Sequence, residues 1–314
     1  MNTKTILSGI CCGAALLPAA LNAQIVYSDL GMADGGNWSV NASALNSNPF
    51  DYVANFGVSY TSALGVPQDP YSTSTTAAQF KINETSGNQA GVSASPTSLS
   101  LSGNYTLSFD MWLNYNSGGF TTGSTQVGAY GFATSATQST WAGVGNGQLF
   151  GEITDNGSGT SYRGYNAGAS IGATPFVGGS QSYASAYHVG LFPSVNVPAA
   201  ETALNPNVSG STVAGTVGFQ WLQVSVSSVN GTISESINGN AIASYSGGGA
   251  TLPDIFLGMY DINNGSAGVS GLADENFALY DNVVVAQVVP EPSTFALAVL
   301  GGSMVLARFR SRKS

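Results

Sequence analysis

A regular alternation of apolar and polar side chains marks the segment 105–115. The six residues of one parity, from Tyr105 to Tyr115, are apolar or aromatic, and the other parity is polar except for Trp112. Successive side chains of a β-strand point to opposite faces, so this alternation over eleven residues predicts a strand with one buried face. Trp112 is predicted on the other, more polar face.

A second alternating stretch, 219–245, predicts a three-stranded antiparallel meander. Apolar and polar residues alternate from Trp221 onward, and two Asn-Gly pairs, at 230–231 and 238–239, separate three short runs. Asn-Gly is a strong hairpin signal, because both residues accept the positive φ that a tight two-residue turn requires.

Three further segments predict strands: 25–28, 255–260 and 277–289. The first of them is expected to pair near the last. In 277–289 we expect Asp281 to share a face with four apolar residues of the same parity: Phe277, Leu279, Val283 and Val285.

Helical periodicity is missing from the body of the sequence, 24–289. Gly, Ser, Asn and Thr fill the intervals between the predicted strands, as the turns of an all-β protein require. We therefore predict an all-β fold, a single antiparallel two-sheet sandwich of the jelly-roll type. Two stacked β domains with a break near 87–98 are the alternative.

Composition and charge narrow the range of partners. Only 7% of the 314 residues are charged, and the formal net charge is −9. The body has Lys81 and Arg163 against 15 acidic residues, a net charge of −13. Phosphate binding needs clustered cations, so nucleic acid is excluded as a partner. Any glycan that the body binds is expected to be neutral, or acidic only through bridging calcium.

The N-terminal residues predict a secretory signal peptide over 1–23. Lys4 precedes an apolar stretch from 6 to 20, and the small residue Ala23 stands before Gln24. Both cysteines of the chain, Cys11 and Cys12, lie in this stretch. Cleavage after Ala23 leaves a mature chain without cysteine, which excludes disulfides and thiolate metal sites.

The C-terminal residues predict a targeting signal as well. An apolar run at 295–307 is followed at once by a basic cluster, which predicts a transmembrane helix with a cytoplasmic end. The tripeptide Pro290-Glu291-Pro292 stands before the run, and neither a helix nor a strand continues through it. The cations of the basic cluster are Arg308, Arg310, Arg312 and Lys313.

This tail, 290–314, resembles the PEP-CTERM sorting signal of exported bacterial proteins. The resemblance implies that an exosortase-type enzyme recognises Pro290, Glu291 and Pro292 after the export machinery has delivered the chain. The helix would first lie in the inner membrane, with Arg308, Arg310 and Arg312 as the stop signal. The body would then reach the cell envelope, the cell surface or the extracellular matrix.

The body carries a second resemblance. The meander that starts at Trp221, with its Ile237-Asn238-Gly239 turn, is similar to the corresponding stretch of concanavalin-A-like and laminin-G-like sandwiches. Several segments also resemble one group of exported proteins that bear the same sorting tail, a group without an established activity. These segments are 56–60, 107–112, 162–165, 256–261 and 279–283.

Catalytic constellations are poorly represented in the sequence. His188, the one histidine, has no nucleophile motif nearby and is predicted to be a structural residue of a strand or loop. Glu152 and Asp155 are the nearest approach to a glycosidase pair, but their spacing puts them on opposite faces of a strand. Because Asn156-Gly157 follows, a turn is the favoured interpretation.

Calcium is the better candidate for a bound metal. This ion prefers carboxylate, amide and carbonyl oxygens, and such residues cluster after two of the predicted strands. The candidate ligands are Asp261, Asn263, Asp274 and Asp281.

A carbohydrate is the predicted ligand of the body. Sugar rings pack on aromatic faces, and Trp112 is the preferred candidate because it lies opposite the apolar face of its strand. The leading hypothesis is a non-catalytic surface or matrix protein that binds neutral polysaccharide. A glycan-cleaving enzyme of concanavalin-A-like type and a purely structural coat protein are the alternatives.

Overall fold

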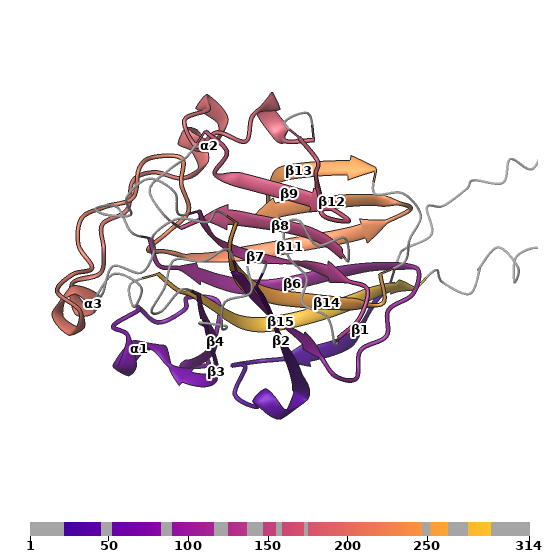
Figure 1. The fold of residues 1–314 in the computed structure, drawn as a ribbon, viewed down its shortest axis with the longest axis horizontal. Coiled ribbons are helices and arrows are strands. Elements are labelled where there is room, and N and C mark those ends of the chain that lie inside the picture. The colour runs from indigo at the N-terminus through magenta and orange to yellow at the C-terminus, as the bar shows by residue number, and fades with distance from the viewer. Residues whose placement is uncertain are drawn as a thin grey trace, which may run out of the picture. The chain divides into compact units, whose positions relative to one another are not determined.

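Strands dominate the structure. In the computed structural model, the chain forms two antiparallel sheets that pack face to face (Figure 1). The structure describes residues 22–44, 52–82, 90–115, 125–136, 147–154, 159–172, 175–246, 252–262 and 276–289. The all-β class and the single two-sheet sandwich that the sequence predicts are confirmed.

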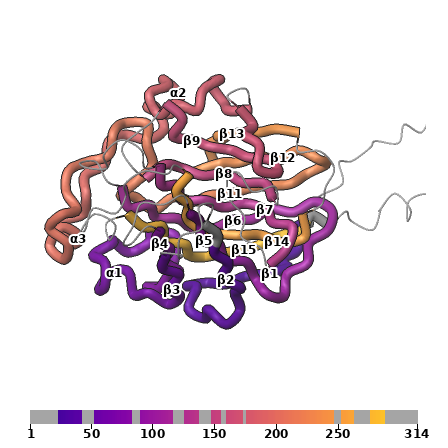
Figure 2. The backbone as a smooth tube through the Cα atoms, in the orientation of Figure 1, coloured from indigo at the N-terminus to yellow at the C-terminus, as the bar shows by residue number. Residues whose placement is uncertain are grey.

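The larger sheet contains eight strands. They are β1 (Asn22–Asp29), β3 (Tyr52–Ser59), β4 (Thr76–Ile82), β6 (Asn104–Leu113), β11 (Trp221–Val229), β12 (Thr232–Ile237), β13 (Asn240–Ser246) and β15 (Ala278–Val289). Their order is β13-β12-β11-β6-β15-β4-β3, and β1 pairs with β15 beside this row. The predicted pairing of the first strand with the last is therefore confirmed, and Figure 2 shows the indigo β1 near the yellow β15.

The second sheet contains seven strands. They are β2 (Trp38–Ala44), β5 (Ala90–Pro96), β7 (Gln126–Ala133), β8 (Gly147–Ile153), β9 (Tyr162–Asn166), β10 (Ala169–Ser170) and β14 (Asp254–Asp261), in the order β10-β9-β8-β7-β14-β5-β2. Strand β5 pairs with β14 on one side and β2 on the other. The segment near 87–98 is thus part of the sheet and does not separate two stacked domains.

The predicted meander is confirmed as β11, β12 and β13. Asn230 and Gly231 have φ of 51° and 79°, and Asn238 and Gly239 have φ of 52° and 75°. Two consecutive residues with positive φ form the turns whose twist matches that of the strands they join. Strand β11 also pairs with β6, which attaches the meander to the middle of the larger sheet.

The predicted face of 277–289 is wrong. Of its four apolar residues, the first two pack on the outer side of the sheet with Trp112, whereas the last two belong to the core between the sheets. The change occurs at Asn282, whose φ of 52° is left-handed and shifts the alternation by one residue. Asp281 and Asn282 consequently both reach the outer face of the sheet.

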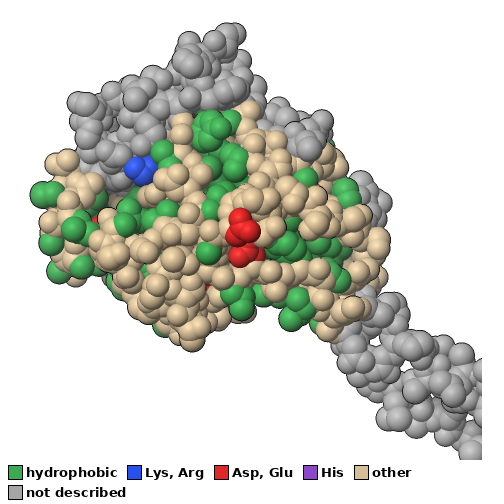
Figure 3. Space-filling view, turned by 90° about the horizontal axis from the view of Figure 1, so that it is seen from below, with side chains coloured by type: hydrophobic (Ala, Val, Ile, Leu, Met, Phe, Trp, Pro, Cys, Tyr) green, Lys and Arg blue, Asp and Glu red, His purple; other side chains and the backbone are tan. Residues whose placement is uncertain are grey.

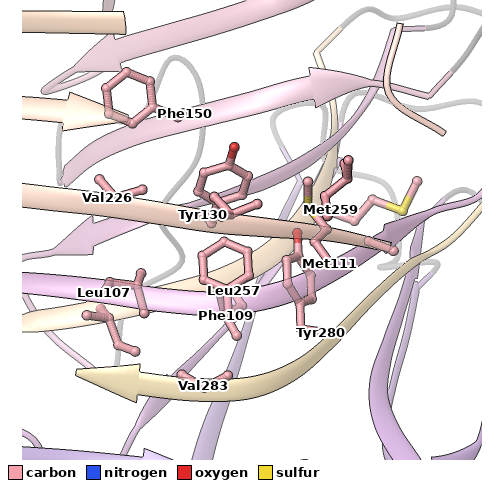
Figure 4. Packing of buried hydrophobic residues seen from close by; sticks show 14 of the residues in the cluster. Leu107, Phe109, Met111, Tyr130, Phe150, Val226, Leu257, Met259, Tyr280 and Val283 are labelled. Atoms are coloured by element: carbon pink, nitrogen blue, oxygen red, sulfur yellow. The ribbon is translucent and has the colours of Figure 1, made fainter. Parts of the chain in front are cut away.

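Aliphatic and aromatic side chains together fill the space between the two inner faces (Figure 4). Phe109 of the larger sheet lies edge-on against Tyr130 of the smaller one, with ring centroids 4.9 Å apart, and 5.5 Å from Tyr280. The buried Tyr280 hydroxyl donates to the backbone oxygen of Gly258 at 2.8 Å. Its polar end is thereby satisfied, which a buried tyrosine requires.

Three short helices lie around the sheets: α1 (Tyr60–Ala63), α2 (Ala186–Leu191) and α3 (Ala199–Leu204) (Figure 1). None of the helices in the described residues is long and apolar enough to cross a membrane. The predicted signal peptide lies outside the described residues except for the first two residues of β1. The predicted sorting tail, 290–314, lies outside them entirely.

Gly131 gives a test of the packing within the smaller sheet. It has a φ of +150°, and a Cβ atom there would lie 2.0 Å from the backbone oxygen of Gln148. We expect Gly131→Ala to lower the free energy of unfolding by ~2 kcal/mol or more, because both the backbone and the strand spacing must change. Gly159→Ala is the control, since a Cβ there meets nothing within 4 Å. Equal urea midpoints for the two variants would contradict this account.

Candidate functional site

The outer face of the larger sheet carries a polar groove of about 620 Å³. This size lies within the range of small-molecule sites in proteins. Leu30 and the segment 71–73 form its sides, and strands β6, β11, β12 and β15 form its floor. The polar side chains of the floor are Ser108, Asp110, Gln223, Ser225, Ser236 and Asn282.

The floor is a direct consequence of strand alternation. Asp110 lies opposite Gln223 in the pairing of β6 with β11, and Ser108 lies opposite Ser225. Ser225 in turn lies opposite Ser236 of β12. The intervening residues point into the core, so the polar parity of each strand faces outward and forms rows of hydroxyl, amide and carboxyl groups.

Asn282 joins the floor of the groove to its side. Its Nδ2 atom donates to Asp110 Oδ2 at 2.6 Å, and its Oδ1 atom accepts from the Ser72 hydroxyl at 3.3 Å. The left-handed conformation of Asn282 makes both contacts possible, because it turns this side chain to the outer face directly after Asp281. Asparagine tolerates this conformation better than most residues.

The side of the groove formed by 71–73 is anchored from beneath. The Tyr60 hydroxyl donates to the Ser74 carbonyl at 2.9 Å, and the Trp221 indole donates to the Pro67 carbonyl at 2.8 Å. Asp69 accepts from the backbone N–H of Tyr71 at 2.8 Å. These bonds hold the Tyr71 side chain at the groove, where it is 47% exposed.

Trp112 is not the exposed aromatic residue that the sequence predicts. It does lie on the outer face of β6, as expected, but only 1% of its surface is exposed. The ring centroids of Trp112 and Trp221 are 5.9 Å apart. Tyr60 packs on Trp221, with ring centroids 5.1 Å apart. The loop after β3 covers this part of the sheet, so Trp112 cannot present a face to a sugar. Tyr71, which no periodicity marks, has that exposure instead.

Carboxyl groups gather behind the floor. Burial, together with the neighbouring carboxyls of Asp110 and Asp281, raises the pKa of Asp69 to about 7. Burial also raises the pKa of Asp110, against hydrogen bonds from Asn282 and Gln223 that favour its ionised form. Among the described residues that line the groove, Asp110 supplies the carboxyl.

A second carboxyl pair lies away from the groove, inside the sandwich. Glu152 and Glu235 come from opposite sheets, and each is 2% exposed. The Tyr130 hydroxyl lies within hydrogen-bond distance of both. Glu152 is therefore part of β8, which corrects the expectation of a turn, and Asp155 lies outside the described residues. Neither glutamate is among the described residues that line the groove.

The predicted calcium ligands divide into two groups. Asn263 and Asp274 lie outside the described residues. Asp261 ends β14 in one sheet, whereas Asp281 lies in β15 of the other, where its Oδ1 atom accepts from the N–H groups of Gly31 and Asn282. Within the described ranges, no three acidic, His or Cys side chains form a group suited to a metal. Calcium binding at the full set stays a prediction.

His188 lies in α2 rather than in a strand or loop. It is buried and stacks on Tyr162 with ring centroids 3.9 Å apart. Its Nδ1 atom lies 2.9 Å from the Ser182 carbonyl and 3.0 Å from the Ser185 hydroxyl. The sorting residues Pro290, Glu291, Pro292, Arg308, Arg310 and Arg312 lie outside the described residues.

No protein-family model matches the chain, and no curated protein matches it. Among solved structures it is similar to a protein of unknown function with a galectin-like fold from Bacillus subtilis, at 9% identity and a TM-score of 0.37 over 87% of this chain and 100% of that one. It is also similar to the metal-free carbohydrate recognition domain of Emp46p, at 8% identity and a TM-score of 0.41 over 82% and 95%. A third similar structure is an endo-beta-1,4-glucuronan lyase from the fungus Trichoderma reesei. Its sequence identity is 12% and its TM-score is 0.38, over 81% of this chain and 98% of that one. These likenesses do not separate a binding protein from an enzyme.

Asn282 provides a test of how the groove is built. Asn282→Ala removes the bond to a buried carboxyl and forces alanine into a left-handed conformation, so we expect a loss of about 2 kcal/mol in the free energy of unfolding. Asn282→Gly removes the same bond but keeps the backbone, and should be about 1 kcal/mol more stable than the alanine variant. Urea denaturation measures both values. An alanine variant as stable as the glycine variant would contradict the role of the left-handed backbone.

Proposed function

We propose that the protein binds a neutral carbohydrate chain in the groove on the outer face of the larger sheet. The observation that carries the proposal is the combination of an amide, hydroxyl and carboxyl floor with the half-exposed ring of Tyr71 beside it. Sugar hydroxyls both donate and accept hydrogen bonds, which matches the side chains of the floor. The apolar faces of sugar rings pack on aromatic rings.

The charge distribution supports a neutral ligand. The body has a net charge of −13, and the groove itself contains Asp110, with Asp69 and Asp281 behind it. An acidic chain would be repelled by these groups. On the face drawn in Figure 3, charged side chains occupy only small areas among uncharged ones.

The proposed role is binding without catalysis. Glycoside hydrolysis ordinarily uses two carboxyls on either side of the scissile bond. Among the described residues that line the groove, Asp110 is the one with a carboxyl group. The Glu152 and Glu235 pair is buried between the sheets. The two alternative functions are cleavage of the glycan and self-assembly into a coat without any glycan.

Tyr71 and Tyr52 form a matched pair for the binding test. Both rings are exposed, at 47% and 37%, but only Tyr71 lines the groove. We expect Tyr71→Ala to weaken binding of the purified protein to immobilised neutral polysaccharide about tenfold or more, because the ring-stacking surface is lost. Tyr52→Ala should bind like the wild type. Affinity electrophoresis or calorimetry gives the dissociation constants.

Each alternative has its own signature in that experiment. Retention no better than that of an unrelated acidic sandwich would exclude carbohydrate binding, and assembly in the absence of glycan would favour a coat protein. Release of oligosaccharides during incubation would favour an enzyme. The predicted binding protein instead holds the polymer and leaves its length unchanged.

Export to the cell surface or extracellular matrix is the second part of the proposal. It is supported by the signal-peptide pattern of 1–23 and by the Pro-Glu-Pro, apolar and basic segments of 290–314. An exosortase-type enzyme would act on Pro290, Glu291 and Pro292 while the apolar helix lies in the inner membrane.

Glu291 tests the sorting proposal. Glu291→Ala removes the one charged group of the tripeptide, and we expect a longer, membrane-held species to accumulate in place of the processed protein. Immunoblots of membrane and extracellular fractions show both forms. Ser293→Ala, next to the tripeptide, is the control and should be processed normally. Normal processing of the Glu291 variant would rule out recognition of the tripeptide.

A further inference from the structure

We infer that Glu152 and Glu235 share a proton across the interior of the sandwich, and that this proton joins the edges of the two sheets in a pH-sensitive switch. The joined state is the one seen in the structure. It forms in acidic solution and opens as the pH rises through the neutral range. The inference concerns the core, so it stands independently of any ligand in the groove.

The groups that make the contact come from both sheets. Tyr130 of β7 and Glu152 of β8 belong to the smaller sheet, and Glu235 of β12 belongs to the larger one. The Tyr130 hydroxyl lies 2.9 and 3.0 Å from the two carboxyl oxygens of Glu152, and 2.5 Å from Glu235 Oε1. All three side chains are buried. One phenol oxygen thus bridges two carboxyls across the sandwich.

The group formed by Tyr130, Glu152 and Glu235 needs a second proton besides that of the phenol. A tyrosine hydroxyl has one proton and donates it to one carboxylate at a time. The Tyr130 hydroxyl is the group that lies within hydrogen-bond distance of both carboxyls, and Glu235 Oε2 is buried without a hydrogen-bond partner. Two ionised carboxylates would repel each other in this geometry. A carboxyl that keeps its proton donates it to the Tyr130 oxygen, while the phenol donates its own proton to the other carboxylate.

The groups packed around the pair are neutral. Tyr162 of β9 donates its hydroxyl proton to the Gly215 carbonyl at 2.8 Å, and Tyr280 donates to Gly258. Burial raises the pKa of Tyr245 of β13, and the Glu235 carboxyl adds to this effect. His188 lies behind Tyr162, and burial lowers its pKa, so it stays uncharged near neutral pH. Among the described residues, the charge that acts on Glu152 is therefore that of Glu235.

These surroundings set the pH at which the proton leaves. Burial raises the pKa of Glu235 to about 7. Burial and the neighbouring carboxyl raise the pKa of Glu152 well above its usual value. Since the folded-state pKa values exceed those of the unfolded chain, the stabilisation is complete in acid and is lost as the pH rises through about 7 and beyond.

The switch lies near one end of each sheet. In the larger sheet β12 is next to the terminal strand β13, and in the smaller sheet only β9 and the two-residue β10 lie beyond β8. Strands at an edge have fewer neighbours to hold them, so they separate before the centre does. Ser236 follows Glu235 and lines the groove on the opposite face, so movement of β12 also changes the groove. That last consequence for binding rests on the proposed function.

Hydrogen exchange of the full chain at pH 5.5 and pH 8.5 tests the inference. After correction for intrinsic exchange rates, we expect protection in β8, β9, β12 and β13 to fall about tenfold or more at the higher pH. Strands β5 and β14, which lie on the other side of β7 from β8 and β9, should change less. The measurement needs no carbohydrate, so a protein that shows this change but binds no glycan would contradict only the proposed function.

Variants separate the shared proton from a general effect of pH. Glu235→Gln supplies an amide N–H that donates to the Tyr130 oxygen while the phenol donates to Glu152, so both sheets stay joined without a titrating proton at residue 235. We expect this variant to keep its protection at both pH values. Asp254→Asn is the control, because Asp254 is another buried carboxyl of raised pKa that accepts from the Ile255 N–H. It should retain the wild-type response in β12.

Two results would overturn the inference. One is equal protection of the wild-type edge strands at both pH values, and the other is an unchanged pH response in Glu235→Gln. If that variant fails to fold, infrared spectroscopy of the wild type decides. The carbonyl band of a buried neutral carboxylic acid is expected at pH 6 in both the wild type and Asp254→Asn and is expected to weaken by pH 9, and its absence at pH 6 would reject the shared proton.

Discussion

The packing of the two inner faces is the interaction on which the rest of the molecule depends. Phe109 lies against Tyr130 across the interface, and Tyr280 closes on the same ring. Burying these aromatic faces fixes which parity of each strand points inward, since a shift by one residue would expose the whole apolar set. The other parity is then outward by necessity. The groove is therefore the reverse side of the core, and Asp110 points into it because Phe109 and Met111 point away from it.

A shortage of cations shapes how this protein buries its acids. Lys81 and Arg163 are the cations of the body, and Arg163 bonds to Thr160 and Tyr165. A buried carboxyl without a cation must find neutral donors or keep its proton. Asp281 accepts hydrogen bonds from two backbone N–H groups. The pair of Glu152 and Glu235 keeps a proton. Because the sequence contains few cations, a buried carboxyl is neutralised by a retained proton, where other proteins would pair it with lysine or arginine.

The local features of the fold could be predicted from the sequence because they depend on short-range patterns. The strand at 105–115 and the Asn-Gly meander are both present with their predicted faces and turns. The predictions fail where a distant segment intervenes. Trp112 lies on its expected face, but a loop more than forty residues earlier in the chain covers it. The left-handed Asn282 breaks an alternation that looks regular in sequence. Tyr71 and the contact between Glu152 and Glu235 belong to no local pattern, since only the packing of two sheets brings the glutamates together.

Strand β12 shows how the two faces are connected. Glu235 points into the core and Ser236 points into the groove, so one strand carries a titrating group on one face and a lining residue on the other. A strand moves as a unit, because its backbone bonds to both neighbours must shift together. A change in the charge of Glu235 therefore acts on the position of Ser236 without any path of intermediate side chains. The coupling needs only the period-two geometry of a strand and a core in which one carboxyl must keep its proton.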